Sequence, residues 1–500
     1  MTTTRILKVL LWGREVGRLS IDTRRKLPYF EFNREWVETG FDISPLDASI
    51  KQPLILRPIF GASEKIYQKL PPFLADSLPD AWGNELFEQW RQQQGIKLGE
   101  ITPLDKLAFI GRRGMGALEF QPEVSAFQST ENINLRALID LANQIYTQRE
   151  NTRIDASQSL TLQALLAVGT SAGGRQPKAI IAINRETGEI RSGQVGELEG
   201  YDYCILKFGI RERSTAELEM AYYEMATKAG IRMMPCWLID VEGEKHFVTQ
   251  RFDRVDGHKL HMQTLAALYP GADSYERLLW VCRKMRLSER DSEEVFRRMV
   301  FNILANNTDD HNKNFSFLMD EQGSWLLSPA YDMTYIFNTG GFLPETYHCM
   351  MIRGKLTGVS LEDVLKLAKE NGIRPAEKII HEVATAIQDF RKIASHYEVS
   401  ERWIAAVEDT LCQNLQSWGL LESDAEATEW SVNGHAVSNF HLEQQFKGNY
   451  LLQATIDGRR MRYIIRKGTV EHDALTQTGL SHLLPETKST LITRLLLDKL

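Results

Sequence analysis

The chain has few cysteines, and their spacing excludes two kinds of site. Five are scattered through 500 residues without any CxxC pair, at Cys204, Cys236, Cys282, Cys349 and Cys412. An odd and dispersed set supplies neither a disulfide framework nor a zinc site. We therefore expect reduced thiols, which are typical of a cytoplasmic protein.

Long apolar runs and a basic excess are also missing. No window approaches about 18 uninterrupted apolar residues, so no transmembrane helix and no membrane partner are expected. The apolar run near the start is interrupted by Lys8 and ended by Arg14, which makes it too short for a secretory signal. A formal net charge of -7 gives no overall attraction to nucleic acid, so any such contact requires a local patch.

The stretch from Phe301 to Asp332, FNILANNTDDHNKNFSFLMDEQGSWLLSPAYD, has the spacing of a kinase catalytic loop. In protein kinases a catalytic Asp is followed five residues later by a metal-binding Asn and, further on, by a magnesium-binding Asp. Asp309, Asn314 and Asp332 have this order. Asp310 lacks the separation and is assigned to shaping the loop.

Two short strands, 315–319 and 325–328, are expected to return Asp332 towards Asn314. Carboxylate and amide oxygens suit magnesium, a hard ion that also binds phosphate oxygens. Lys313 would then face the transferring phosphate. The alternative is that NNTDDHN is simply a polar turn, because Asn and Asp favour turns.

A helix should lead into this loop, with Asp291 or Ser292 as its cap. A second expected helix starts at a capping box of Ser214 and Glu217 and stops at Gly230. Residues 360–418 are mostly helical in pattern, with a further capping box of Ser360 and Asp363.

A glycine-rich turn, VGTSAGGRQPKAIIAIN at 168–184, precedes a strand expected over 178–183. Glycines let backbone amides approach a phosphate, and basic side chains add positive charge. The candidate phosphate-binding residues are Gly169, Ser171, Ala172, Gly173, Gly174, Arg175 and Lys178. The turn lacks the GxxxxGK[ST] order of a Walker A loop, and an ordinary hairpin is the alternative.

The next strand, YDYCILKF at 201–208, carries Lys207 among apolar residues. A lysine in such a strand loses solvation unless it finds an anion, and Glu219 on the following helix is placed to supply one. A strand lysine paired with a helix glutamate orients ATP phosphates in kinases. A surface salt bridge is the alternative.

The strand HFVTQRFDR, 246–254, ends in a charged cluster. In a two-lobed kinase the connection between the lobes offers backbone groups to adenine, which would fall to Gln250 and Phe252, and Asp253 could take a ribose hydroxyl. A strand-end salt network of Arg251, Asp253 and Arg254 is the structural alternative.

The two ends of the chain differ in pattern. Residues 5–33 alternate as a small antiparallel sheet, and a helix with Trp82, Leu86 and Trp90 four residues apart should pack on it. The tail from about 430 has a hairpin at Asp457-Gly458 and, after Pro485, a terminal helix. The hairpin carries a basic patch that is either a nucleic-acid contact or a solvated strand face: Arg459, Arg460, Arg462, Arg466 and Lys467 around Tyr463.

The order of these segments resembles the HipA-type serine/threonine kinases of bacterial toxin-antitoxin modules. The matching segments are FLADSLPDAWGNELF, GMGALEF, TSAGGRQPKA, YCILKF, the helix of Glu219, RFDR, NTDDHNKNFSF and SPAYD. They keep their order over residues 5 to about 420, and the tail has no counterpart.

The resemblance implies roles for single residues. Asp309 would be the catalytic base, Asn314 and Asp332 the magnesium ligands, and Lys207 the phosphate lysine. Ser171, with Thr170 as its neighbour, takes the place of a serine that autophosphorylates and disables ATP binding.

The expected fold is α+β, a bilobal protein-kinase-like fold with an amino-terminal β-rich subdomain, a mostly helical larger lobe and a small carboxy-terminal α/β extension. The expected boundaries are 1–125 for the amino-terminal subdomain, 126–255 for the ATP-binding lobe, 256–425 for the helical catalytic lobe and 430–500 for the extension.

The expected function is that of a cytoplasmic, ATP- and magnesium-dependent serine/threonine protein kinase, the toxin of a toxin-antitoxin module. Its expected partners are a helix-turn-helix antitoxin, a translation component such as an aminoacyl-tRNA synthetase as substrate, and operator DNA, reached indirectly or through the basic tail. The alternatives are a non-catalytic ATP-binding co-repressor that acts with an antitoxin, and a metal-dependent phosphoesterase using Asp309, Asp310, His311 and Asp332.

Overall fold

The computed structural model of the chain describes residues 5–465 apart from several gaps. The gaps are residues 23, 62, 98–100, 124–133, 149–160, 162–164, 167–175, 185, 194–197, 256, 339–343, 422–429, 433–434, 445–449 and 457–458. The chain divides into two units, Met1–Leu420 and Leu421–Leu500.

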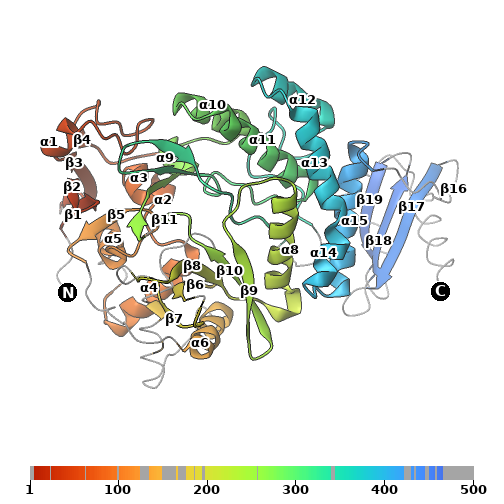
Figure 1. Cartoon of the computed structure of the whole chain (residues 1–500), viewed down its shortest axis with the longest axis horizontal. Coiled ribbons are helices and arrows are strands. Elements are labelled where there is room, and N and C mark those ends of the chain that lie inside the picture. Colours follow the sequence, from red (N-terminus) through yellow and green to blue (C-terminus); the bar gives the residue numbers. More distant parts are fainter. Residues whose placement is uncertain are drawn as a thin grey trace. The chain divides into compact units, whose positions relative to one another are not determined.

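The first unit begins with a five-stranded antiparallel sheet in the order β4-β3-β2-β1-β5 (Figure 1). Its strands are β1 (Ile6–Leu11), β2 (Arg14–Asp22), β3 (Leu27–Phe32), β4 (Ile55–Leu56) and β5 (Leu118–Gln121). Alternate side chains of β1, those of Leu7, Val9 and Leu11, are fully buried. The predicted antiparallel beginning is confirmed, because alternating apolar residues place one face of a strand against a core.

Helices complete what we call the amino-terminal part, residues 5–123. They are α1 (Arg34–Glu38), α2 (Glu64–Tyr67), α3 (Pro72–Ala75), α4 (Ala81–Gln93) and α5 (Pro103–Ile110). The helix predicted from Trp82, Leu86 and Trp90 is α4, and all three side chains are buried.

A second five-stranded antiparallel sheet has the order β7-β6-β8-β10-β9. Its strands are β6 (Lys178–Ile183), β7 (Ile190–Ser192), β8 (Asp202–Lys207), β9 (Cys236–Val241) and β10 (Glu244–Gln250), and helix α6 (Leu135–Gln148) precedes it. Helix α8 (Thr215–Lys228) packs on β9 and β10.

The capping box predicted at Ser214 is wrong. Ser214 has a φ of 46° and its side chain makes no capping hydrogen bond. Its hydroxyl instead accepts the backbone N–H of Ser400 at 3.3 Å, while Thr215 accepts that of Ile210 at 2.8 Å. A tertiary contact therefore replaces the local cap.

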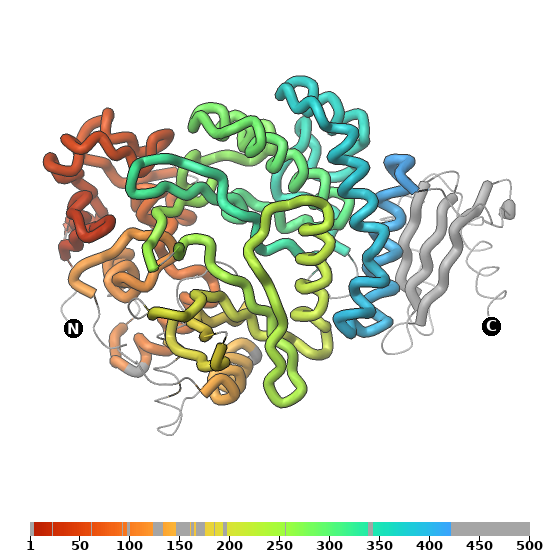
Figure 2. The backbone as a smooth tube through the Cα atoms, viewed as in Figure 1, coloured from red at the N-terminus to blue at the C-terminus, as the bar shows by residue number. Residues whose placement is uncertain are grey.

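The remainder of the first unit is mostly helical (Figure 2). Its helices are α9 (Leu265–Leu268), α10 (Tyr275–Lys284), α11 (Glu289–Leu304), α12 (Leu361–Glu370), α13 (Ala376–Gln388), α14 (Phe390–His396) and α15 (Glu401–Ser417). Two small sheets accompany them, β11 (Arg254–Val255) with β12 (His258–Lys259), and β13 (His261–Thr264) with β14 (Ser316–Met319) and β15 (Trp325–Leu327). The predicted hairpin before Asp332 is confirmed, because β14 and β15 pair antiparallel.

The cap predicted for α11 is corrected by one turn. Ser288, not Asp291 or Ser292, is the N-cap, and Asp291 closes a capping box with it. The hydroxyl of Ser288 accepts the N–H of Asp291, whose carboxylate accepts the N–H of Ser288. The box predicted at Ser360 and Asp363 is confirmed.

The second unit contains an antiparallel sheet of β16 (Trp430–Val432), β17 (His435–Gln444), β18 (Tyr450–Ile456) and β19 (Arg459–Ile465). Pairing of β18 with β19 confirms the predicted hairpin. The turn Asp457-Gly458, Arg466, Lys467 and the predicted terminal helix lie outside the described residues.

The chain thus has mixed α and β content with several small sheets, in agreement with the expected class. In the part of the chain that the structure describes, no helix has both the length and the apolar character to cross a bilayer.

Candidate active site

Three predicted residues meet at one ammonium group. Lys207, the last residue of β8, is 8% exposed, and its Nζ donates to Glu219 of α8 and to Asp332 Oδ1, the latter at 2.5 Å. Asp332 lies five residues beyond β15 with a φ of 57°. The strand, the helix and the loop therefore converge, as the sequence predicts.

These contacts set the ionisation of the cluster. Burial alone would lower the pKa of Lys207, but Asp332 and Glu219 outweigh it and raise that pKa. Burial opposes the charge on Asp332 too, yet Lys207 and Lys178 lower its pKa to about 2. Lys207 is thus held as a cation and Asp332 as an anion, which is the state that a phosphate site requires.

A second cation, Lys178, adjoins this cluster. It is the first residue of β6, is 3% exposed, and lies directly opposite Lys207 in the β6–β8 pairing. Its Nζ lies 3.6 Å from Asp80 Oδ2, and burial lowers its pKa. Both lysines thus lie beside Asp332 and Glu219, which act on them electrostatically.

The predicted catalytic loop joins α11 to β14. The Asp309 side chain is 51% exposed, and Asn314 Nδ2 donates to the Asp309 carbonyl at 2.7 Å, which closes the loop. His311 Nε2 lies 3.8 Å from Asp309 Oδ1, and the same imidazole acts electrostatically on Asp332. Asp309 is therefore open to a substrate hydroxyl at the edge of the charged cluster.

Helix α8 ties the lysine cluster to this loop. Tyr222, one turn beyond Glu219, is fully buried, and its hydroxyl donates to the carbonyl of Ala305 at 2.7 Å. Ala305 caps α11 and lies four residues before Asp309. The same helix that holds Lys207 thus also fixes the start of the loop.

Asp310 has the structural role that its spacing suggested. It is 1% exposed and accepts from Tyr275 Oη at 2.7 Å, from the backbone N–H of Cys349 at 2.8 Å, and pairs with His348 Nδ1 at 3.0 Å. Because both of its oxygens are taken, Asp310 does not fit the ligand role that a phosphoesterase would require.

Lys313 is exposed in the same loop, and its carbonyl accepts the hydroxyl of Tyr331 at 2.7 Å. Its charge acts on Asp76 and Asp80 of the amino-terminal part. One of these carboxylates, Asp80, lies beside Lys178. The predicted role of Lys313 at the phosphate stays a prediction.

The donor chemistry at Asn314 and Asp332 fits magnesium. The Asn314 amide nitrogen donates to the loop, which leaves its carbonyl oxygen as the possible ligand atom, and the Asp332 side chain is 35% exposed. Within the described residues no group of three or more His, Cys, Asp or Glu could hold a metal. A site of two protein oxygens completed by phosphate and water agrees with the way magnesium binds in nucleotide enzymes.

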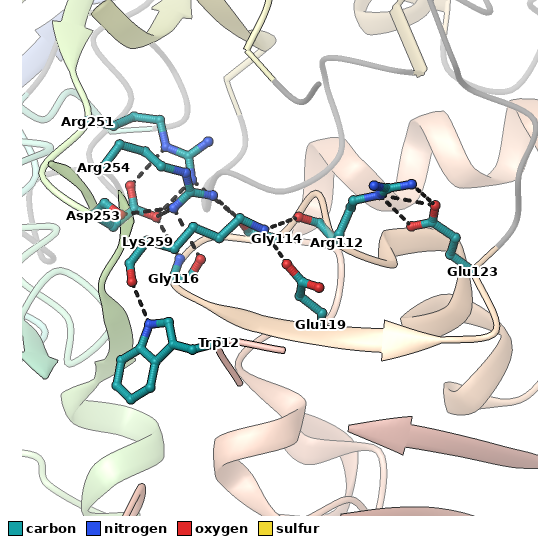
Figure 3. A network of polar contacts seen from close by, with 10 residues as sticks. All are labelled: Trp12, Arg112, Gly114, Gly116, Glu119, Glu123, Arg251, Asp253, Arg254 and Lys259. Atoms are coloured by element: carbon teal, nitrogen blue, oxygen red, sulfur yellow. Dashed lines mark hydrogen bonds and ion pairs between the residues drawn. The ribbon is translucent and has the colours of Figure 1, made fainter. Parts of the chain in front are cut away.

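The predicted ribose contact of Asp253 is not supported. Asp253 is 0% exposed, and its carboxylate accepts from Arg251, Arg254 and the backbone N–H of Gly116 (Figure 3). These donors hold the pKa of Asp253 well below its usual range although burial opposes its charge. Asp253 therefore belongs to a strand-end salt network, which is the structural alternative predicted from the sequence.

The other predicted nucleoside residues lie beside this network. Gln250 donates to Asp202 Oδ1 at 3.0 Å, and the rings of Phe252 and Tyr331 lie 5.4 Å apart. Their adenine role stays a prediction. Thr170, Ser171, Ala172, Gly173, Gly174 and Arg175 lie outside the described residues, as does Gly169.

Sequence reasoning missed Asp80 and Asp76 as neighbours of the site. Asp76 accepts the N–H and hydroxyl of Thr264, and burial raises its pKa. The segment FLADSLPD carries both carboxylates, but on its own it indicates only the start of a helix. Their partners lie about a hundred residues or more away, so no local pattern connects them.

Family models and known relatives match much of this chain. A family model for the HipA-like C-terminal domain matches residues 170–390, and one for the HipA N-terminal domain matches residues 7–121. "Putative kinase Y4mE" of Sinorhizobium fredii is 27% identical over 398 residues, which cover 74% of this chain and 87% of that protein. "Serine/threonine-protein kinase toxin HipA" of Shewanella oneidensis is 21% identical over 464 residues, covering 81% of this chain and 98% of that protein.

A solved structure is also similar, that of the Shewanella oneidensis MR-1 toxin antitoxin system HipA, HipB and its operator DNA complex. It gives a TM-score of 0.58 at 17% identity and covers 82% of this chain and 97% of that chain, a likeness that concerns the fold alone. The two family models match both the amino-terminal part and the segment that carries the charged cluster, and the chain therefore belongs to the HipA family.

Proposed function

We propose that the chain is an ATP- and magnesium-dependent serine/threonine protein kinase with a bilobal kinase-like arrangement. The observation that carries this proposal is the contact of Lys207 with both Glu219 and Asp332. A strand lysine held by a helix glutamate beside a magnesium-binding aspartate is the arrangement that orients ATP phosphates in kinases. The kinase names of relatives support it.

In the proposed reaction, Asp309 orients the substrate Ser or Thr hydroxyl and accepts its proton as the oxygen attacks the γ-phosphate. Lys207 offsets the charge of the phosphates, with Lys178 or Lys313 assisting. Magnesium, held by Asn314 and Asp332, would supply charge neutralisation between the phosphates. ADP leaves, and the phosphate remains on the acceptor hydroxyl.

The proposed parts are 1–125 for the amino-terminal subdomain, 126–255 for the ATP-binding lobe, 256–425 for the catalytic lobe and 430–500 for an extension. The nucleoside would lie against the backbone of Gln250 and Phe252. Ser171, or Thr170, would be the autophosphorylated residue, where a phosphate adds roughly two negative charges next to the ATP phosphates.

The biological proposal is a cytoplasmic toxin restrained by a helix-turn-helix antitoxin that binds operator DNA. The similar structure contains HipA with HipB and operator DNA, and a relative is named a toxin, which supports this reading. The proposed substrate class is a translation component such as an aminoacyl-tRNA synthetase.

Labelled ATP tests the activity directly. Purified wild-type protein is expected to transfer the γ-phosphate to itself or to a lysate protein, and Asp309→Ala to transfer none. Asp409→Ala on α15 is the matched control, because it removes another exposed aspartate and should transfer normally. Equal labelling by wild type and Asp309→Ala would refute the kinase proposal.

A further inference from the structure

Residues at the start of α4 contact both the side chain and the backbone of Lys178. Asp80 is the N-cap of α4, where its Oδ1 accepts the N–H of Gly83 at 2.5 Å. Its Oδ2 lies 3.6 Å from Lys178 Nζ. Two residues further on, Trp82 Nε1 donates to the Lys178 carbonyl at 3.0 Å. A segment almost a hundred residues away therefore fixes both the backbone and the side chain of this lysine.

Lys178 requires such a partner because of its position. It faces Lys207 directly across the β6–β8 pair, and two like charges opposite each other destabilise a sheet. Burial adds a second penalty on the charged form of Lys178. Glu219 and Asp332 already bond to Lys207, and Asp80 is a carboxylate with an oxygen 3.6 Å from Lys178 Nζ.

One carboxylate oxygen of Asp80 is not needed for the helix cap. Its Oδ2 is buried and, within the described residues, makes no hydrogen bond, while Oδ1 alone serves the helix cap. A helix cap requires only a side-chain oxygen, and asparagine caps as well as aspartate. The negative charge of Asp80 is therefore not needed by α4, and its effect falls on Lys178.

We infer that Asp80 is a positioning residue of the nucleotide site, holding Lys178 charged and in place beside the Lys207–Asp332 pair so that two cations meet the triphosphate. This inference rests on the proposed kinase function. It makes the amino-terminal part a component of the nucleotide site, because the aspartate that orients a phosphate-binding lysine comes from α4.

The test is the affinity for ATP with magnesium, measured by calorimetry on the full chain. Asp80→Asn keeps the cap oxygen but removes the charge, so the Kd and the KM for ATP should rise about tenfold while kcat changes by less than about threefold. Glu88→Gln removes a charge from the same helix, where Glu88 pairs with Arg91 at 2.7 Å, and should change neither. Equal ATP affinity in Asp80→Asn and Glu88→Gln would overturn the inference.

A double-mutant cycle with Lys178→Met asks whether Asp80 acts through the lysine. Asp80→Asn should weaken ATP binding in the wild-type background and have almost no further effect once Lys178 is absent. Additive losses would show that Asp80 acts by another route and would overturn the inference.

The pH dependence provides a readout that a purely structural role would not change. Burial raises the pKa of Asp80 to about 6, against the lowering effects of Lys178, the Gly83 N–H and Lys313. Asp80 therefore loses its charge as the pH falls from about 8 to about 5, and the ratio of the variant and wild-type KM values should approach one. A ratio that stays constant would contradict the assignment.

The inference and the proposed function can fail separately. Asp309→Ala is expected to bind ATP normally and to transfer no phosphate. Transfer by Asp309→Ala would count against the proposed function, whereas an unaltered ATP affinity in Asp80→Asn would count against the inference alone.

Discussion

Two charge clusters, one around Asp253 and one around Lys207 and Asp332, differ in how many hydrogen-bond donors their aspartates already bind. Asp253 is 0% exposed and accepts from two arginines and a backbone N–H. The Asp332 side chain is 35% exposed, and its Oδ1 accepts a hydrogen bond from Lys207. A buried carboxylate whose oxygens already accept hydrogen bonds cannot bind a ligand, whereas a partly exposed carboxylate beside a cation can. The number of hydrogen-bond donors that a carboxylate already binds, rather than the density of charge, therefore distinguishes a structural cluster from a candidate site.

Asp332→Asn should give the largest loss of activity. It removes a charge that the phosphates and magnesium would require, so kcat for phosphate transfer is expected to fall about a hundredfold to a thousandfold. The change in the free energy of unfolding should be small, since the side chain is partly exposed. Transfer assays and urea unfolding measure both. A variant with normal kcat would remove Asp332 from the site.

Asp253→Asn should show the opposite behaviour. It leaves Arg251 and Arg254 buried without their anion, so the free energy of unfolding is expected to fall by about 3 to 5 kcal/mol. The folded fraction should retain its Kd for ATP. A large rise in Kd with unchanged stability would reverse the comparison and restore the ribose role.

Asp332→Asn should also change how the free energy of unfolding depends on pH in acid. The folded pKa of Asp332, about 2, lies below its ordinary value, so its contribution is present above about pH 4 and is lost as the pH falls towards 2. Because the side chain is more than a third exposed, we expect only about 1 kcal/mol. Unfolding free energies between about pH 5 and pH 2 should therefore fall less steeply in the variant. Parallel curves would contradict this.

Lys259→Met at the rim of the Asp253 network should have the smallest effect. Lys259 pairs with Glu119 at 2.8 Å and donates to the Arg112 carbonyl, but both charged side chains are about a quarter exposed (Figure 3). A loss of about 1 kcal/mol or less in unfolding free energy is expected, with no change in ATP affinity. A loss as large as that of Asp253→Asn would show that the rim and the centre act as one unit.

Local periodicity predicted most of the elements and the residues that they carry. Alternation placed β8 and Lys207, helical spacing placed α8 and Glu219, and the hairpin before Asp332 brought that residue back to the loop. Each of these inferences depends on residues that are near neighbours in the chain. The convergence of Lys207 with Asp332 followed once a known order of segments was matched.

The failures share one physical cause, which is a partner distant in sequence. Ser214 was expected to cap α8, but it contacts Ser400 instead. Asp253 was expected to face a ligand, but Gly116 and two arginines enclose it. Asp80 was not expected at the site at all, because its contact with Lys178 joins segments that no local pattern relates.

Tyr222 and Glu219 lie on adjacent turns of α8. The hydroxyl of Tyr222 contacts Ala305, and the carboxylate of Glu219 contacts Lys207. A rotation of α8 about its axis would therefore disturb the strand lysine and the base of the Asp309 loop in the same movement. The positions of Lys207 and of the Asp309 loop therefore both depend on α8.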